Sequence, residues 1–183
     1  VTKIGINAFY ECEGLTSVTI PSSVTEIVRG AFSQCKNLTT VKLSNGLVNI
    51  GDGAFSGCGK LADITIPNSV VKIGFEAFKG CKSITSITIP NSVKTIEANA
   101  FEGCESITSI KIPKSVRKIG GAFMGCENLA EVTISEGVTE IDESAFSLCV
   151  NLTTVKLPNS LTKIGEQAFM GCTKLVNITI PEG

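Results

Sequence analysis

The 183-residue chain has no histidine, no tryptophan and a single tyrosine. Without histidine, it lacks the commonest general acid–base group and metal ligand. The absence of tryptophan and the single tyrosine argue against a surface that stacks nucleic-acid bases. The formal net charge is only −1, with no basic patch for nucleic acid or anionic lipid, and no apolar run approaches the roughly 18 residues that span a bilayer. The sequence therefore predicts neither nucleic-acid binding nor membrane insertion.

Catalytic motifs are also missing. No serine lies in a Gly-x-Ser-x-Gly nucleophile elbow, and the glycines form neither a Walker loop nor a dinucleotide fingerprint. Asp142 and Glu143 are adjacent, but adjacent acidic residues in a turn are typical of a solvated corner. We predict that the chain is not an enzyme and holds no cofactor and no metal.

What the chain does contain is a repeat. Eight cysteines recur every 23 residues, with one step of 22, and a phenylalanine precedes each of them by three residues. Self-similarity at this period indicates a solenoid of stacked coils. The cysteines are Cys12, Cys35, Cys58, Cys81, Cys104, Cys126, Cys149 and Cys172.

One repeat, Leu15–Asn37, illustrates the expected coil. It opens with Leu-x-x-Val-x-Ile, in which Val18 and Ile20 alternate with polar residues, a pattern typical of a short, half-buried strand. Pro21 ends that strand because proline has no N–H to donate. Val24 and Ile27 then predict a second short segment that points inward.

The end of the repeat carries Ala31, Phe32 and Cys35. Their spacing suits one helical or 3₁₀ turn facing the core. Stacking the coils predicts a right-handed, α/β-type solenoid with a parallel sheet on its concave side and turns opposite. We assign one domain, residues 1–183, with partial repeats at 1–14 and 175–183 and full repeats at 15–37, 38–60, 61–83, 84–106, 107–128, 129–151 and 152–174.

The pattern L-x-x-V-x-I-P-x-S-V-x-x-I-G-x-x-A-F-x-G-C resembles the BspA-type leucine-rich repeat. Its distinguishing pairs are Ala-Phe and Gly-Cys, as at Ala77-Phe78 and Gly80-Cys81. The resemblance extends over the whole chain. It implies a cell-surface or secreted protein, since the family occurs in surface proteins of oral and gut bacteria, spirochaetes and some parasitic protists.

The cysteine column has three interpretations. Neighbouring coils would bring Cα atoms within disulfide range, but in-register side chains run parallel rather than toward each other. A linear column without histidine does not supply tetrahedral zinc ligands. We favour buried free thiols that act as small hydrophobic groups, with a disulfide and a metal site as the alternatives.

The outward strand positions are the candidate binding site. They carry hydroxyls and scattered charges that offer hydrogen bonds to a partner, although threonine is also simply a good exposed strand residue. The predicted partner-binding residues are Thr40, Lys42, Asp63, Thr65, Ser86, Thr88, Ser109, Lys111, Glu131, Thr133, Thr154 and Lys156.

Two non-enzymatic functions follow. The first is a protein-binding or adhesion module, whose partner the family resemblance suggests is a host extracellular-matrix or cell-surface protein, or another microbial cell. The second is a structural spacer or self-associating rod, because apolar solenoid ends can stack end to end.

The sequence departs from its repeat at two places. Phe75 is expected to be partly exposed, and the deletion at Gly120-Gly121 is expected to change the curvature of the solenoid locally.

Overall fold

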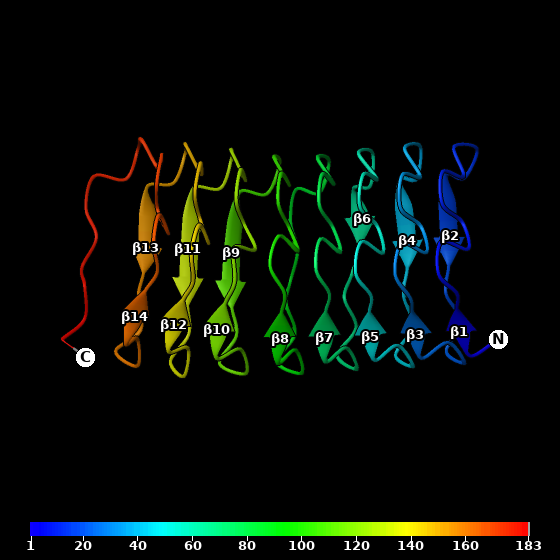
Figure 1. Cartoon of the computed structure of the whole chain (residues 1–183), viewed down its shortest axis with the longest axis horizontal. Coiled ribbons are helices and arrows are strands. Elements are labelled where there is room, and N and C mark those ends of the chain that lie inside the picture. The colour runs from blue at the N-terminus through cyan, green and yellow to red at the C-terminus, as the bar shows by residue number, and fades with distance from the viewer. Residues whose placement is uncertain (183) are drawn as a thin grey trace.

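The computed structural model describes residues 1–182 as a row of stacked coils, with the two termini at opposite ends (Figure 1). Each coil places one short isoleucine-containing strand in a continuous parallel sheet of eight strands. The strands pair in register, so that isoleucine lies beside isoleucine along the stack. In stack order they are β1 (Lys3–Ile4), β3 (Glu26–Ile27), β5 (Asn49–Ile50), β7 (Lys72–Ile73), β8 (Thr95–Ile96), β10 (Lys118–Ile119), β12 (Glu140–Ile141) and β14 (Lys163–Ile164).

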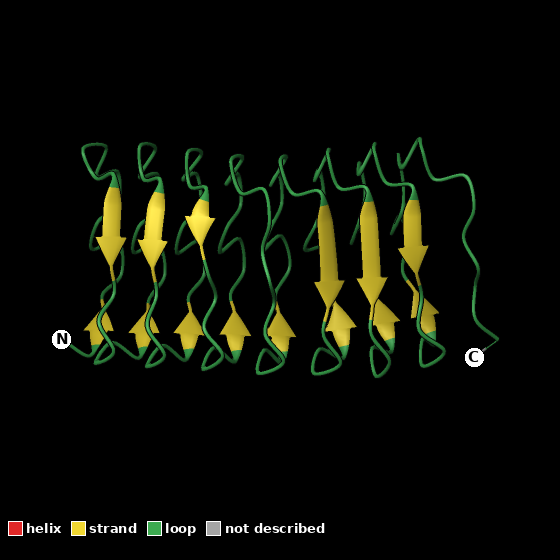
Figure 2. Cartoon of the chain, turned by 180° about the vertical axis from the view of Figure 1, so that it is seen from behind, coloured by secondary structure: helices red, strands yellow, loops and turns green. Residues whose placement is uncertain are grey.

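The Leu-x-x-Val-x-Ile strands form a second layer, and this layer is divided. It consists of two three-stranded sheets. Figure 2 shows them toward the two ends of the stack, separated by a coil that contributes no strand to this layer. One sheet contains β2 (Ser17–Thr19), β4 (Thr40–Lys42) and β6 (Asp63–Ile64), and the other contains β9 (Ser109–Ile112), β11 (Glu131–Ile134) and β13 (Thr154–Lys156). The expected single sheet across all coils is therefore replaced by two.

The predicted helical turn around Phe32 is absent, since residues 1–182 contain no helix. The reason lies in the use of backbone N–H groups. Those of Ala31 and Ser33 donate to carbonyls three residues earlier, whereas those of Gly30 and Phe32 donate to the next coil. Left-handed residues at positions 30 and 34 bound the segment, leaving too short a run for a helix.

The core is built from repeated columns. The phenylalanine rings of successive coils stack with centroids 5.0 to 5.5 Å apart and planes within 11° of parallel. Six of these rings, from Phe32 to Phe146, are completely buried. Each ring pair adds about 0.5–1.5 kcal/mol beyond the area that it buries. A continuous core along the stack follows from this arrangement.

The shortened repeat is accommodated within a turn. The N–H of Ala122 donates to the carbonyl of Gly120, two residues earlier. The N–H groups of the equivalent residues Ala54 and Ala77 donate to carbonyls three residues earlier. The neighbouring rings Phe101, Phe123 and Phe146 keep their ordinary stacking distances. The deletion thus leaves the core column continuous.

No helix among residues 1–182 is long and apolar enough to cross a membrane.

Candidate interaction surface

The strand face is the surface formed by the outward side chains of β2, β4, β6, β9, β11 and β13 and by the matching residues of the coil between the two sheets. Ten of the twelve predicted residues lie within or directly after these strands. Thr40 lies beside Asp63, and Glu131 lies between Ser109 and Thr154. Thr133 similarly lies between Lys111 and Lys156. The structure therefore brings the predicted residues together in two groups, one on each sheet.

The remaining two predicted residues, Ser86 and Thr88, lie where the second layer is divided, and they line a groove of about 480 Å³. Ser109 and Lys111 line the same groove, as do Ile87 and Ile89. The groove also contains residues that the sequence analysis did not single out: Asn68, Asn91, Pro90 and Pro113. The signal that could have identified them is the proline that ends most of these segments, which is followed by asparagine at Asn68, Asn91 and Asn159.

The backbone beside this groove has unused hydrogen-bonding capacity. Residues 85–89 make no backbone–backbone hydrogen bond in the described chain, whereas the equivalent residues of β11 are paired on both sides. A serine two residues after the proline recurs in several coils, at Ser69, Ser92, Ser115 and Ser160, and its hydrogen bonding changes at the same place. Ser69 donates to the carbonyl of Leu47 at 2.6 Å, but the buried hydroxyls of Ser92 and Ser115 have no partner within residues 1–182. The groove is therefore the point of weakest contact between coils on this face.

The charges of the strand face are almost unpaired. Lys156 and Glu131 approach to 4.0 Å, with both side chains more than half exposed, so this pair contributes little. Lys42 and Lys111 form no ion pair with any described residue. These lysines are therefore free to meet acidic groups on a partner.

The cysteine column lies away from this face, in the core. Cys35, Cys58, Cys81, Cys104, Cys126 and Cys149 are completely buried, which confirms the prediction that these six pack as core residues. Each of their Sγ atoms donates to a phenylalanine carbonyl of the preceding coil at 3.0 to 3.3 Å. The end residues Cys12 and Cys172 are only half-buried. Between residues 1 and 182 no three potential metal ligands cluster.

The repeat and its geometry define a class, the leucine-rich-repeat solenoids. Residues 2–121 and 120–183 match the BspA type leucine-rich repeat region, in six copies. The chain therefore belongs to the BspA-type leucine-rich-repeat family, and the resemblance seen in its sequence is confirmed.

Two solved structures support this assignment. A leucine-rich repeat protein from Bacteroides ovatus is 37% identical, with a TM-score of 0.93 over 100% of this chain. The Treponema pallidum leucine-rich repeat protein (TpLRR) is 33% identical, with a TM-score of 0.82, and the match covers 88% of this chain and 78% of that one. The chain spans about half, 47%, of the Bacteroides protein. No curated protein matches it.

Proposed function

We propose that the chain is a non-enzymatic protein-binding module of a surface or secreted protein, and that its partner binds the strand face. The family to which it belongs consists commonly of surface proteins. The observation that supports binding is the groove between the two sheets, where Ser86, Thr88, Ser109 and Lys111 meet unpaired backbone. A host extracellular-matrix or cell-surface protein is the proposed partner.

The size of the face sets what a partner must contact. Seven coils at about 4.8 Å and strands of about four residues at 3.3 Å give roughly 34 by 13 Å. That area, about 440 Å², is little more than half of the roughly 800 Å² per partner in a standard interface. We therefore infer that a partner also contacts the Pro-Asn turns beside the strands, which include Asn68 and Asn91.

A structural spacer is the second candidate. An apolar recess of about 370 Å³ at the N-terminal end of the stack, lined by Val1, Ile4, Phe9, Val18 and Phe32 among others, favours it. A second coil could cover such a surface, and end-to-end association would lengthen the rod.

The test compares the Lys42→Glu, Lys111→Glu double variant with the unmodified chain in surface binding to fibronectin, fibrinogen and collagen and to host cells. We expect saturable binding that falls at least tenfold in the variant, because two cations at the partner's contact become anions. The matched control is Lys94→Glu, Lys174→Glu, which makes the same charge change at exposed lysines off the strand face.

Binding that survives in the strand-face variant contradicts the proposed site. Equal loss in both double variants indicates a general charge effect and contradicts it as well. No binding by any form, together with sedimentation that shows concentration-dependent rods, favours the spacer.

A further inference from the structure

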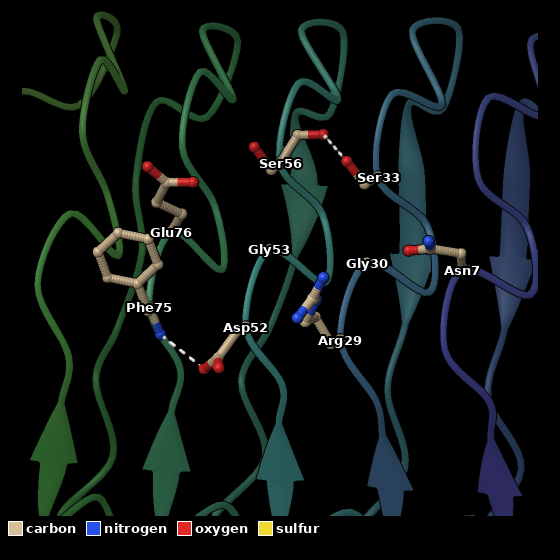
Figure 3. A pocket seen from close by; sticks show the side chains of 9 residues that line it. All are labelled: Asn7, Arg29, Gly30, Ser33, Asp52, Gly53, Ser56, Phe75 and Glu76. Atoms are coloured by element: carbon tan, nitrogen blue, oxygen red, sulfur yellow. Dashed lines mark hydrogen bonds between the residues drawn. The ribbon is translucent and has the colours of Figure 1, made fainter.

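A second recess lies on the turn side of the solenoid, away from the strand face. It spans four successive coils at the N-terminal half and has a volume of about 380 Å³ (Figure 3). Its lining residues come from the segment that follows β1, β3, β5 and β7: Asn7, Arg29, Gly30, Ser33, Asp52, Gly53, Ser56, Phe75 and Glu76.

Small residues create the recess. One column of the repeat takes left-handed backbone in most coils and holds Asn7, Glu76 or Asn99, but Gly30 and Gly53 occupy it in the two middle coils. A Cβ at Gly30 would clash with Oδ1 of Asn7, whereas a Cβ at Gly53 would meet only Ser56, at 3.9 Å. Gly53 therefore forms an open floor.

The polar groups around this floor are held in place. Asp52 Oδ1 accepts a hydrogen bond from the backbone N–H of Phe75 at 3.0 Å, and Lys79 donates to Glu76 Oε1 at 2.8 Å. Bonds to Glu76 and Glu102 raise the pKa of Lys79 above its ordinary value, so that it remains a cation. Arg29 makes no ion pair within residues 1–182.

An aromatic ring completes the wall. Phe75 is 44% exposed, as its departure from the repeat predicted, and Figure 3 shows it on one side of Asp52 with Arg29 on the other. An exposed phenyl ring offers an apolar platform, while the carboxylates accept and the guanidinium donates hydrogen bonds.

The charges select the ligand class. Glu76 is already paired with Lys79, which lies outside the lining. Arg29 and Asp52 are therefore the charged groups left to a ligand, and because their charges are opposite the recess favours neither an anion nor a cation. A neutral ligand with many hydroxyls and one apolar face satisfies both donors and acceptors. We propose that this recess binds a carbohydrate, with C–H groups of one sugar ring on Phe75 and its hydroxyls on Asp52 and Arg29. The site is separate from the proposed strand-face site.

The test is a glycan array followed by calorimetry with maltose, cellobiose, lactose and N,N′-diacetylchitobiose. We expect binding to at least one glycan, weakened about five- to tenfold by Phe75→Ala. Gly53→Asn should abolish it by filling the floor. Asparagine occupies the same column at Asn7 and Asn99 with the same left-handed backbone, so the fold should accept it.

Two control variants match these changes outside the recess. Ser144→Asn places the same side chain in the same left-handed column as Gly53→Asn. Arg29→Gln removes the guanidinium and should also weaken binding, and Arg117→Gln is its control at an exposed arginine outside the recess. Both controls should bind as the unmodified chain does, as should the Lys42→Glu, Lys111→Glu variant. Absence of binding to every glycan at up to about 20 mM overturns the proposal. So does binding that is unchanged in folded Gly53→Asn and Phe75→Ala, or equally lost in the controls.

Discussion

At the scale of single residues, the cysteines do what few other side chains could do in that column. The space around each thiol is small and inaccessible to solvent, yet it faces a phenylalanine carbonyl of the preceding coil. A thiol fills such a space as a hydrophobic group and still donates a weak hydrogen bond. Serine would make a stronger bond but at a greater cost of desolvation.

Burial also makes stability depend on alkaline pH. It raises the pKa of the Cys58 thiol to about 12 from an ordinary value of 9.0, and it raises those of Cys81, Cys104 and Cys126. Above pH 9 the unfolded chain loses thiol protons that the folded chain keeps. The contribution of these thiols to the free energy of unfolding is therefore fully present below pH 9 and is lost as the pH rises. Each such thiol contributes about 1.4 kcal/mol per pH unit in that window.

We therefore predict that Cys81→Ala makes this fall less steep by about 1.4 kcal/mol per pH unit, measured by urea unfolding from pH 8 to pH 11. Val93→Ala is the control, since it removes core volume without a titrating group and should leave the slope unchanged. A slope that is identical in Cys81→Ala and the unmodified chain would show that the thiols are not its source.

At the scale of elements, the strands are two to four residues long and depend on their neighbours. Where pairing ends, protection should end as well. The backbone amides of residues 85–89 are expected to exchange with solvent on the order of 100-fold faster than those of β11. Native-state hydrogen exchange measures this directly. Equal protection in both segments would mean that the two sheets join in solution.

The sequence predicted much of this level and failed at two definite points. Periodicity alone placed the inward isoleucine, phenylalanine and cysteine columns, because each repeats in every coil. The divided sheet could not be predicted, since the unpaired segment Ile84–Pro90 differs from the paired segment Ile107–Pro113 only by Thr88 in place of Lys111. Nothing in the structure explains that difference in pairing.

The turn segments were the second failure. A helical turn was expected from three inward residues, but alternate N–H groups bond to the next coil. The left-handed column holds Glu76, Ser144 and Gln167 besides glycine and asparagine, so that residue type alone does not reveal it. Of the strand-face residues, the outward positions followed from alternation, whereas the groove depends on how neighbouring coils separate.

At the scale of the whole molecule, the stack behaves as a row of similar units that contact only their neighbours. Deleting one complete repeat, residues 129–151, should leave a folded shorter solenoid. Its denaturant m-value should fall by about an eighth, because m follows the surface exposed on unfolding. Deleting residues 129–140 instead should prevent cooperative folding, since the columns that follow lose their register. Similar unfolding of both deletions by circular dichroism would contradict this modular behaviour.

The parallel ladder also determines how the molecule would respond to force. The hydrogen bonds between coils run along the stack, and the two ends of the chain lie at opposite ends of it (Figure 1). Tension applied to those ends would peel the bonds one coil at a time rather than shear them all together. Each released coil of 23 residues supplies roughly 80 Å of extended chain. Held between two bodies under load, such a solenoid would lengthen in steps and absorb work at each one.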